Sequence, residues 1–145
     1  MRFRQGPDFI DPMWLSAAAG RECRNLDLFM MGDEEIMKSV SRNAADAGTA
    51  VIEGNMGLFD SIDVEGRGST SDLARQLESP VILVVNTRNM TRSIAPLVQG
   101  FTQFEPDINI AGVILNMVSG PRHEEKLRGV LARYCDIEVV GAIRR

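Results

Sequence analysis

The chain has 145 residues, the size of one domain, and 44% of them are hydrophobic, which is enough to bury a core. A net charge of −4 and a sequence pI of about 5.0 argue against general attraction to nucleic acid or anionic membranes. No apolar run approaches the roughly 20 residues of a membrane span, and the start lacks the apolar segment of a secretory signal. Two distant cysteines, Cys23 and Cys135, lack metal-ligand spacing and predict free thiols in a reducing cytoplasm.

The first 20 residues predict a strand, a turn and a helix. Residues 3–5 can form a short strand, and a helix is expected from about Met13 to Ala19, ending where Gly20 permits a left-handed turn. The turn between them carries two acids, Asp8 and Asp11. Their residue types favour turn chemistry for Asp8 and a helix cap for Asp11, and a functional role stays open at this point.

A second helix and a second strand follow. Asp33 is expected to cap a helix whose apolar residues recur at helical spacing and which ends at Gly48. Residues 25–27 before it are interpreted as a polar interruption. The apolar run 50–52 then predicts a short buried strand that ends abruptly in an acid, Glu53.

Glu53 is the residue around which the sequence is organised. Gly54 and Gly57 follow it, so a turn begins there and the backbone can come close to a ligand. A carboxylate at the carboxyl end of a buried parallel strand lies where open α/β sheets bind ligands, and nucleotide sites use such an acid to hold Mg²⁺. The alternative is a strand that simply ends in a solvated acid. The loop 55–69 is long enough to be functional or mobile.

The remaining elements alternate in type. Residues 80–86 are apolar without alternation, as expected for a strand covered by helices on both faces. The other elements are a helix opening at residues 68–72, helices at about 91–104 and 121–134, and strands at 110–115 and 137–143. This order predicts an α/β three-layer fold, with a mostly parallel sheet and helices on both faces. Ligand-binding groups are expected at the strand ends Glu53, Asn86 and Asn116.

Four segments resemble the synthetase domain of the cobyrinate a,c-diamide synthase family, within the dethiobiotin-synthetase-like P-loop ATPases. They are GPDFIDP (6–12), VIEGNMGLFD (51–60), GSTSDLA (68–74) and IAGVILN (110–116). The resemblance implies a P-loop NTPase-like fold and an ATP-dependent carboxylate-amide ligase. In this family ATP phosphorylates the a and c side-chain carboxylates of a tetrapyrrole such as cobyrinate, and ammonia then displaces the phosphate. The expected cofactors are ATP and Mg²⁺, which neutralises charge on the phosphate oxygens.

The same resemblance assigns residues to roles. Glu53 matches the metal-binding acid, and Asp8 and Asp11 match catalytic acids at the junction of nucleotide and tetrapyrrole. Arg4 and Asn116 match ATP-binding positions. The positions matched to the tetrapyrrole are Phe9, Ile10, Asn55, Gly57, Leu58 and Ser69.

The sequence also departs from the family pattern. No segment matches the phosphate loop Gly-x-x-x-x-Gly-Lys-Ser/Thr, so residues 1–145 are expected to form a partial synthetase domain without the first strand. The amidotransferase domain that supplies ammonia from glutamine is expected to be absent too. Arg4 stands where the family usually has Lys. Leu15 and the segment 86–96 look more like the sirohaem-amidating relatives.

These departures leave two alternatives to a cobyrinate amidase. The first is a sirohaem or sirohydrochlorin-type amidase, and the second is a non-catalytic nucleotide-binding remnant. A cytoplasmic protein without nucleic-acid or membrane partners is expected in each case, and a homodimer is left open.

Overall fold

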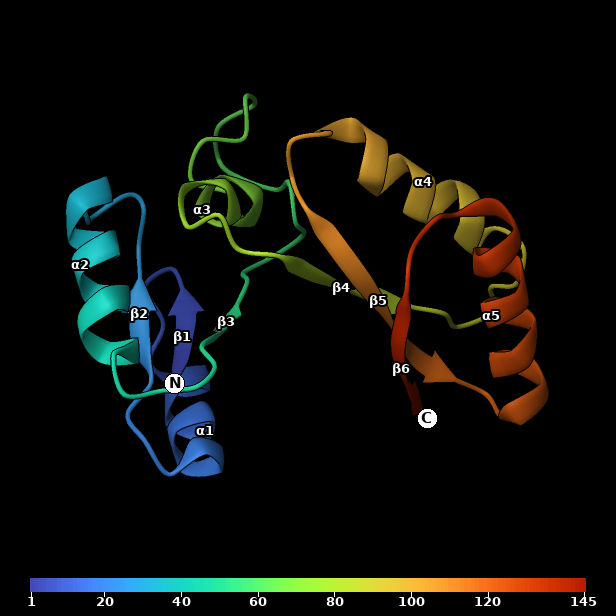
Figure 1. Ribbon diagram of the computed structural model, residues 1–145, viewed down its shortest axis with the longest axis horizontal. Helices are drawn as coiled ribbons and strands as arrows, with labels where there is room; N and C mark the ends of the chain where they lie inside the picture. Colours follow the sequence, from blue (N-terminus) through green and yellow to red (C-terminus); the bar gives the residue numbers. More distant parts are fainter. The chain divides into compact units, whose positions relative to one another are not determined.

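The computed structural model describes residues 1–145 and divides them into two compact units, Met1–Glu78 and Ser79–Arg145 (Figure 1). Each unit contains a three-stranded sheet with helices packed against it, and every strand pair is parallel. The predicted α/β fold with parallel strands is therefore confirmed. The strands are distributed over two sheets.

The first unit is built around its central strand. Its elements are β1 (Arg2–Gln5), α1 (Ile10–Ala19), β2 (Arg24–Leu26), α2 (Asp33–Ala44), β3 (Val51–Glu53) and α3 (Thr70–Gln76). The strand order is β2-β1-β3, so β1 has a neighbour on both edges. Three consecutive residues of β1, namely Phe3, Arg4 and Gln5, are consequently buried.

The two faces of this sheet differ in chemistry because side chains alternate along a strand. Phe3 packs with Leu26, Ile36 and Leu73 in a fully buried cluster, which places α2 and α3 on that face. Arg4 points to the opposite face, where its guanidinium contacts Asp11 of α1. The central strand thus carries the apolar core on one side and a buried charge on the other.

Three boundaries in this unit differ from the sequence-based expectations. β2 overlaps residues 25–27, which were interpreted as a polar interruption. Its three residues pair with β1 but are too few to show a periodic pattern. α1 begins at Ile10, so Asp11 lies in its first turn, and the N-cap is Phe9 without a side-chain bond. Likewise Asp33 lies inside the first turn of α2 and does not cap it.

The burial of β3 was also predicted wrongly. Val51 is 56% exposed and Ile52 is half-buried, because β3 pairs only with β1 and forms an edge of its sheet. α2 ends at Ala44, four residues before the expected Gly48. The strand nevertheless ends at Glu53, as expected.

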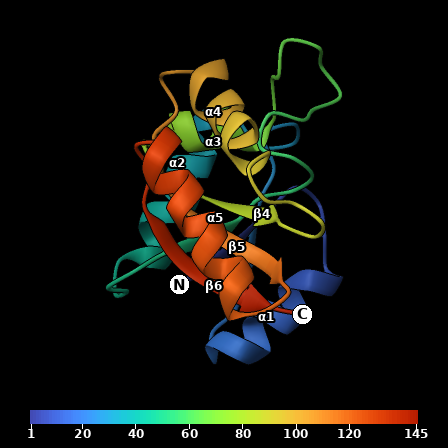
Figure 2. The ribbon, with the colours of Figure 1, turned by 90° about the vertical axis from the view of Figure 1, so that its right-hand side faces the viewer.

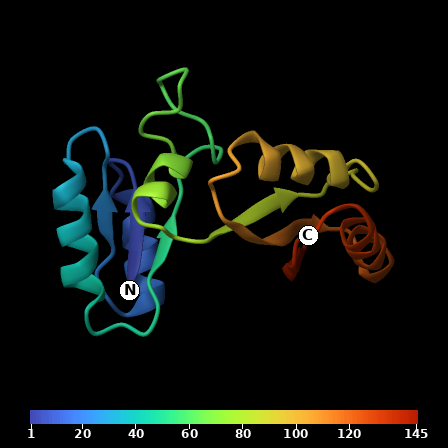
Figure 3. The same cartoon turned by 45° about the horizontal axis from the view of Figure 1, so that its top comes forward.

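The second unit packs two helices on one side of its sheet (Figures 2 and 3). Its elements are β4 (Val81–Asn86), α4 (Ile94–Phe104), β5 (Ile110–Val118), α5 (Pro121–Tyr134) and β6 (Val139–Arg144), with strand order β4-β5-β6. Leu83 and Val85 are buried, whereas their neighbours Ile82 and Val84 are 43% and 57% exposed. Helices were expected to cover both faces of β4. Within this unit they cover only one face, because α4 and α5 contact each other and pack on the same side of the sheet.

Both cysteines are free, as predicted. Cys23 is buried and Cys135 is half-buried, and burial raises the pKa of both thiols above the ordinary value. None of the helices combines the length and the apolar character needed to cross a membrane.

Candidate active site

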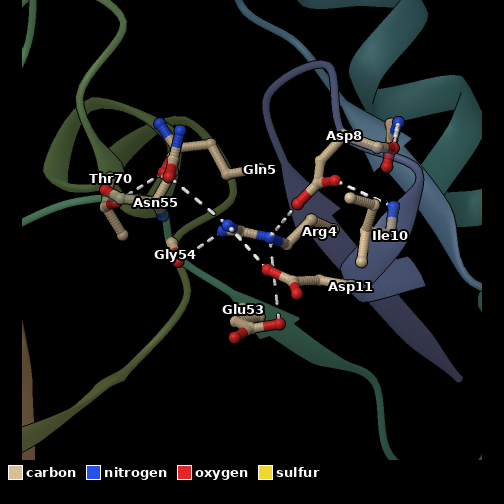
Figure 4. A network of polar contacts seen from close by, with 10 residues as sticks. Arg4, Gln5, Asp8, Ile10, Asp11, Glu53, Gly54, Asn55 and Thr70 are labelled. Carbon is tan, nitrogen blue, oxygen red and sulfur yellow. Dashed lines mark hydrogen bonds and ion pairs between the residues drawn. The ribbon is translucent and has the colours of Figure 1, made fainter. Parts of the chain in front are cut away.

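The candidate site lies at the carboxyl ends of β1 and β3. Arg4 and Glu53 are partners in the parallel register of these strands. After β1 the chain turns at Gly6, whose φ of +83° suits a residue without a side chain. This turn brings Asp8 and Asp11 back toward Arg4 (Figure 4). Ends of parallel strands are where open α/β sheets bind ligands.

Three carboxylates surround one guanidinium. Arg4 Nη2 donates to Asp11 Oδ2 at 3.3 Å, while Arg4 Nε lies 3.5 Å from Asp8 Oδ2 and 3.9 Å from Glu53 Oε2. Arg4 is only 8% exposed, whereas the Glu53 side chain is 47% exposed. The cluster therefore carries more negative than positive charge, and part of that charge faces solvent. The three acids matched to catalysis lie together, as their predicted roles require.

The same guanidinium fixes the chain after β3. Arg4 Nη1 donates to the Gly54 carbonyl oxygen at 2.7 Å, and Nη2 donates to Asn55 Oδ1 at 3.3 Å. Hydrogen bonds from a charged donor are stronger than neutral ones. Arg4 thus joins the turn after β1 to the turn after β3, a structural role that its match to ATP binding does not include.

Asp8 is held in its ionised form. Its Oδ1 accepts a hydrogen bond from the Ile10 N–H at 3.0 Å, and this bond lowers the pKa of the Asp8 carboxyl below its ordinary value. Desolvation opposes the shift, and Asp11 and Arg4 add to it. Asp8 therefore contributes a negative charge beside Arg4 at neutral pH.

This shift predicts a dependence of stability on pH. A depressed pKa in the folded state means that Asp8 stabilises the protein above its ordinary pKa of 3.8 and that this stabilisation is lost as pH falls through the folded-state pKa. We expect Asp8→Asn to lower the free energy of unfolding at pH 7, and the difference from the parent to shrink at pH 3. Urea unfolding at both pH values measures it, with exposed Asp136→Asn as the control. An equal difference at both pH values would contradict the assignment.

Gly54 permits a close approach between the start of the loop and α3. A Cβ at Gly54 would lie 2.7 Å from Thr70 Cγ2 and 2.8 Å from Thr70 Oγ1, which is too close. A side chain at position 54 would therefore force Thr70 to move where β3 meets the helix that follows the loop.

We expect Gly54→Ala to destabilise the chain by about 1–3 kcal/mol, because Thr70 must move to admit the methyl group. Gly129 in α5 is the matched control, since nothing lies within 4 Å of a Cβ there. Gly129→Ala should stabilise by about 0.5–1 kcal/mol through helix propensity. Thermal unfolding of both variants measures these changes in stability. A Gly54→Ala protein as stable as the parent would show that Thr70 moves aside at no cost.

The positions matched to the tetrapyrrole differ in accessibility. Phe9 and Ile10 are exposed at the start of α1, and Asn55 is bonded to Arg4. The Gly57 N–H donates to Asp60 Oδ2 at 3.1 Å and closes a turn of the loop.

Two further positions face the interior of the unit. Leu58 is buried, and Ser69 is fully buried with its hydroxyl accepting the Asp72 N–H at 3.1 Å as the N-cap of α3. The structure thus gives both a packing or capping role, and their match to substrate stays a prediction.

Asn116 belongs to the second unit. It lies near the end of β5, where its carbonyl oxygen accepts hydrogen bonds from the Thr87 N–H at 2.9 Å and the Thr87 hydroxyl at 2.8 Å. Its side chain accepts from the Met117 N–H at 2.9 Å. Asn116 therefore orders the strand ends of this unit, and its predicted contact with adenine stays a prediction.

The sequence reasoning missed Gln5. This residue is 6% exposed at the end of β1, and its side chain bonds to both ends of the loop after β3. Its position at the end of a strand, directly before the Gly6 turn, could have indicated a role at the site, since ligands bind at the carboxyl ends of the strands in open α/β sheets.

A cavity of about 570 Å³ opens at the same strand ends. Its lining combines apolar side chains with acids and amides from the ends of β1 and β2 and from the loop after β3. The lining residues are Gln5, Gly6, Pro7, Asp27, Leu28, Phe29, Asn55, Met56, Asp60, Ser61, Ile62, Asp63, Arg67 and Gly68. Several of its apolar side chains, including Phe29, Met56 and Ile62, are strongly exposed. The volume lies in the range of small-molecule sites.

Comparisons with known proteins place the chain in a family. Residues 12–145 match the family model described as an AAA domain. The cobyrinate a,c-diamide synthase of Magnetococcus marinus is 50% identical over 143 residues, covering 99% of this chain and 31% of that protein. That of Syntrophotalea carbinolica is 47% identical over 130 residues, covering 89% of this chain and 28% of that protein. The hydrogenobyrinate a,c-diamide synthase of Brucella ovis is 47% identical over 144 residues, covering 98% and 32%.

The chain thus spans about a third of the length of the curated relatives it matches. The family model covers both units and includes Glu53, but it begins at residue 12, after Asp8 and Asp11. The match to the Magnetococcus marinus protein covers 99% of the chain and includes all three carboxylates. Together they confirm the predicted α/β fold of the P-loop NTPase type and the predicted resemblance. The chain belongs to the AAA domain family, and within it resembles the segment shared by cobyrinate and hydrogenobyrinate a,c-diamide synthases.

Proposed function

We propose that this chain serves an ATP-dependent amidase that converts the a and c side-chain carboxylates of a tetrapyrrole such as cobyrinate into amides. The similarity to a,c-diamide synthases over 99% of the chain carries this proposal. The cluster of Asp8, Asp11 and Glu53 around Arg4 supports it, because phosphoryl transfer uses carboxylates that hold Mg²⁺ beside the phosphate oxygens. The reaction takes place in the cytoplasm, with ammonia from glutamine supplied by an amidotransferase domain.

Magnesium fits this site as an ion held by a single protein carboxylate. No group of three or more Asp, Glu, His or Cys side chains in residues 1–145 is arranged to hold a metal ion. Mg²⁺ is usually bound by one or two carboxylates together with substrate phosphates, and the half-exposed Glu53 suits that arrangement. When bound, the ion neutralises charge on the phosphate oxygens.

The acids after β1 take a different role in this proposal. Asp8 and Asp11 lie on the turn that leads into α1, next to the exposed side chains of Phe9 and Ile10. This turn places charged and apolar groups side by side, which suits a substrate with an apolar macrocycle and carboxylate side chains. We assign Asp11 to placing the reacting carboxylate, and the neighbouring cavity to receiving the macrocycle.

A chimera tests the proposal directly. This chain replaces the matching segment of the Magnetococcus marinus relative, which is 50% identical to it. We expect the chimera to convert cobyrinate to its a,c-diamide with ATP, Mg²⁺ and glutamine, as detected by mass spectrometry. A folded chimera that forms no amide, while the unmodified relative does, would refute the proposal.

The same assay separates the two alternatives. Leu15 and the segment 86–96 favour a sirohaem-type substrate, so sirohydrochlorin is tested beside cobyrinate. Preference for sirohydrochlorin would change the substrate and keep the reaction. Nucleotide binding without any amide formation would identify a non-catalytic remnant.

The isolated chain should behave differently from the chimera. The 145 residues contain no Gly-x-x-x-x-Gly-Lys-Ser/Thr segment, and phosphate affinity in this fold rests on that loop at a helix N-terminus. We expect no measurable glutamine-dependent amidation by the purified chain under the same conditions. Amidated product above the level of a no-protein control would show that these residues suffice.

A further inference from the structure

Gln5 connects the two ends of one loop. It is the last residue of the central strand β1, and its side chain lies among the groups that begin and end residues 54–69 (Figure 4). Gln5 Oε1 accepts the Asn55 N–H at 3.1 Å and also accepts the Thr70 hydroxyl. Gln5 Nε2 donates to the Gly68 carbonyl oxygen at 2.9 Å. One side-chain amide therefore contacts the loop just after β3 and again just before α3.

The bonds of Gln5 reach both halves of the candidate site. Asn55, whose N–H it fixes, accepts a hydrogen bond from Arg4, the centre of the carboxylate cluster. Gln5, Asn55 and Gly68 also line the cavity. The residue thus stands between the charged cluster and the cavity and bonds to a lining residue at each end of the loop.

The amide group is chemically specific at this position. Its oxygen meets two donors and its nitrogen meets a carbonyl oxygen, so only a side chain with both an acceptor and a donor satisfies the set. A carboxylate of the same length keeps the acceptor and cannot donate to Gly68. An apolar side chain provides neither group and leaves the loop ends without these partners.

We propose that Gln5 is a positioning residue that holds both ends of the 54–69 loop and so fixes the cavity relative to Arg4 and its carboxylates. This inference rests on the proposed function, since it assigns the cavity to the macrocycle of the substrate. Gln5 acts through Asn55 and Gly68 and takes no part in the chemical step.

Hydrogen exchange of the full chain tests the structural part. In Gln5→Leu, amide exchange should rise about tenfold in residues 54–58 and in residues 66–70, because a lost hydrogen bond of this kind changes local opening by that order. In Gln5→Glu, only residues 66–70 should exchange faster. Exposed Gln103→Leu in α4 is the control and should leave both segments unchanged. If a folded Gln5→Leu chain exchanges both segments at the parent's rates, the proposal is overturned. If Gln5→Leu fails to fold, the exchange of residues 66–70 in Gln5→Glu decides the question in the same way.

Kinetics of the chimera test the link to the substrate. We expect Gln5→Leu to raise KM for cobyrinate about tenfold while kcat stays within about threefold, the pattern of lost binding without lost chemistry. Faster loop exchange with an unchanged KM would show a merely structural residue and overturn the proposal.

The two proposals fail in different ways. If the parent chimera amidates cobyrinate and Gln5→Leu matches it in KM, only the role of Gln5 is wrong. If the parent chimera forms no amide, the proposed function is wrong, and absorbance titration with cobyrinate decides the role of Gln5. Weaker cobyrinate binding by Gln5→Leu than by the parent would then support the positioning role of Gln5. Equal cobyrinate binding by the two proteins, or no binding by the parent, would overturn that role.

Discussion

Glu53→Gln in the chimera is expected to lower kcat for amide formation about a hundredfold, which corresponds to a loss on the order of 3 kcal/mol. Glutamine keeps the size of Glu53 and one acceptor oxygen, and it removes the charge. The transition state for phosphoryl transfer then loses one preorganised electrostatic contact. The substitution should disturb the fold little, since Glu53 is half-exposed and its 3.9 Å distance to Arg4 Nε is the longest of the three ion-pair contacts.

Asp11→Asn is the matched comparison within the same cluster. Asp11 accepts from Arg4 at 3.3 Å and lies on α1, next to Ile10. We expect this variant to change KM for the tetrapyrrole, or the choice between its two carboxylates, more than kcat. Steady-state kinetics on both variants and binding by absorbance separate the effects. A Glu53→Gln chimera within threefold of the parent in kcat would show that Glu53 only ends a strand.

Arg4→Met is expected to destabilise the chain by roughly 2–3 kcal/mol, the scale of hydrogen bonds made by a charged group. The substitution removes the bonds to Gly54, Asn55 and Asp11, and leaves mutually repelling carboxylates around the vacated space. Because these carboxylates are partly exposed, water screens their repulsion and keeps the effect below that of a fully buried ion pair.

Urea unfolding measures this loss of stability, and two further variants serve as controls. Arg4→Lys keeps the charge without the planar fork, so it should recover part of the lost stability. Arg2→Met changes the same residue type in the same strand at a more exposed position and should have a smaller effect. Equal stability of Arg4→Met and the parent would mean that Arg4 does not hold the two turns together.

Much of the fold is predictable from the sequence because its longer elements have distinct patterns. β4 and α5 are found within a residue of the expected bounds, since an uninterrupted apolar run and a helix opened by Pro121 are strong signals. β2 is not predictable in this way, since its three residues, two polar and one apolar, are too few to show a period. The exposure of Val51 and Val84 depends on which faces and edges the helices and strands cover, which local sequence does not encode.

The candidate site divides in a similar way. Asp8, Asp11 and Glu53 were each matched to a role in the reaction, and the structure brings them together around Arg4. The interpretation of Asp8 as a turn residue and of Asp11 as a helix cap was half right: the Asp8 carboxylate accepts the Ile10 N–H, whereas Asp11 lies inside α1 and does not cap it. Gln5 escaped prediction because its contacts are with residues 50 and more positions away, and such contacts follow from the fold.

The most direct test of the account follows one oxygen atom. If ATP phosphorylates the substrate carboxylate and ammonia displaces the phosphate, an oxygen of that carboxylate leaves with the phosphate. With cobyrinate labelled with oxygen-18 in its a and c carboxylates, the chimera should release phosphate that carries the label for each amide formed, as read by mass spectrometry. Amide formation with unlabelled phosphate would contradict the account, since ATP would then have been hydrolysed by water and the carboxylates would not have been its acceptor.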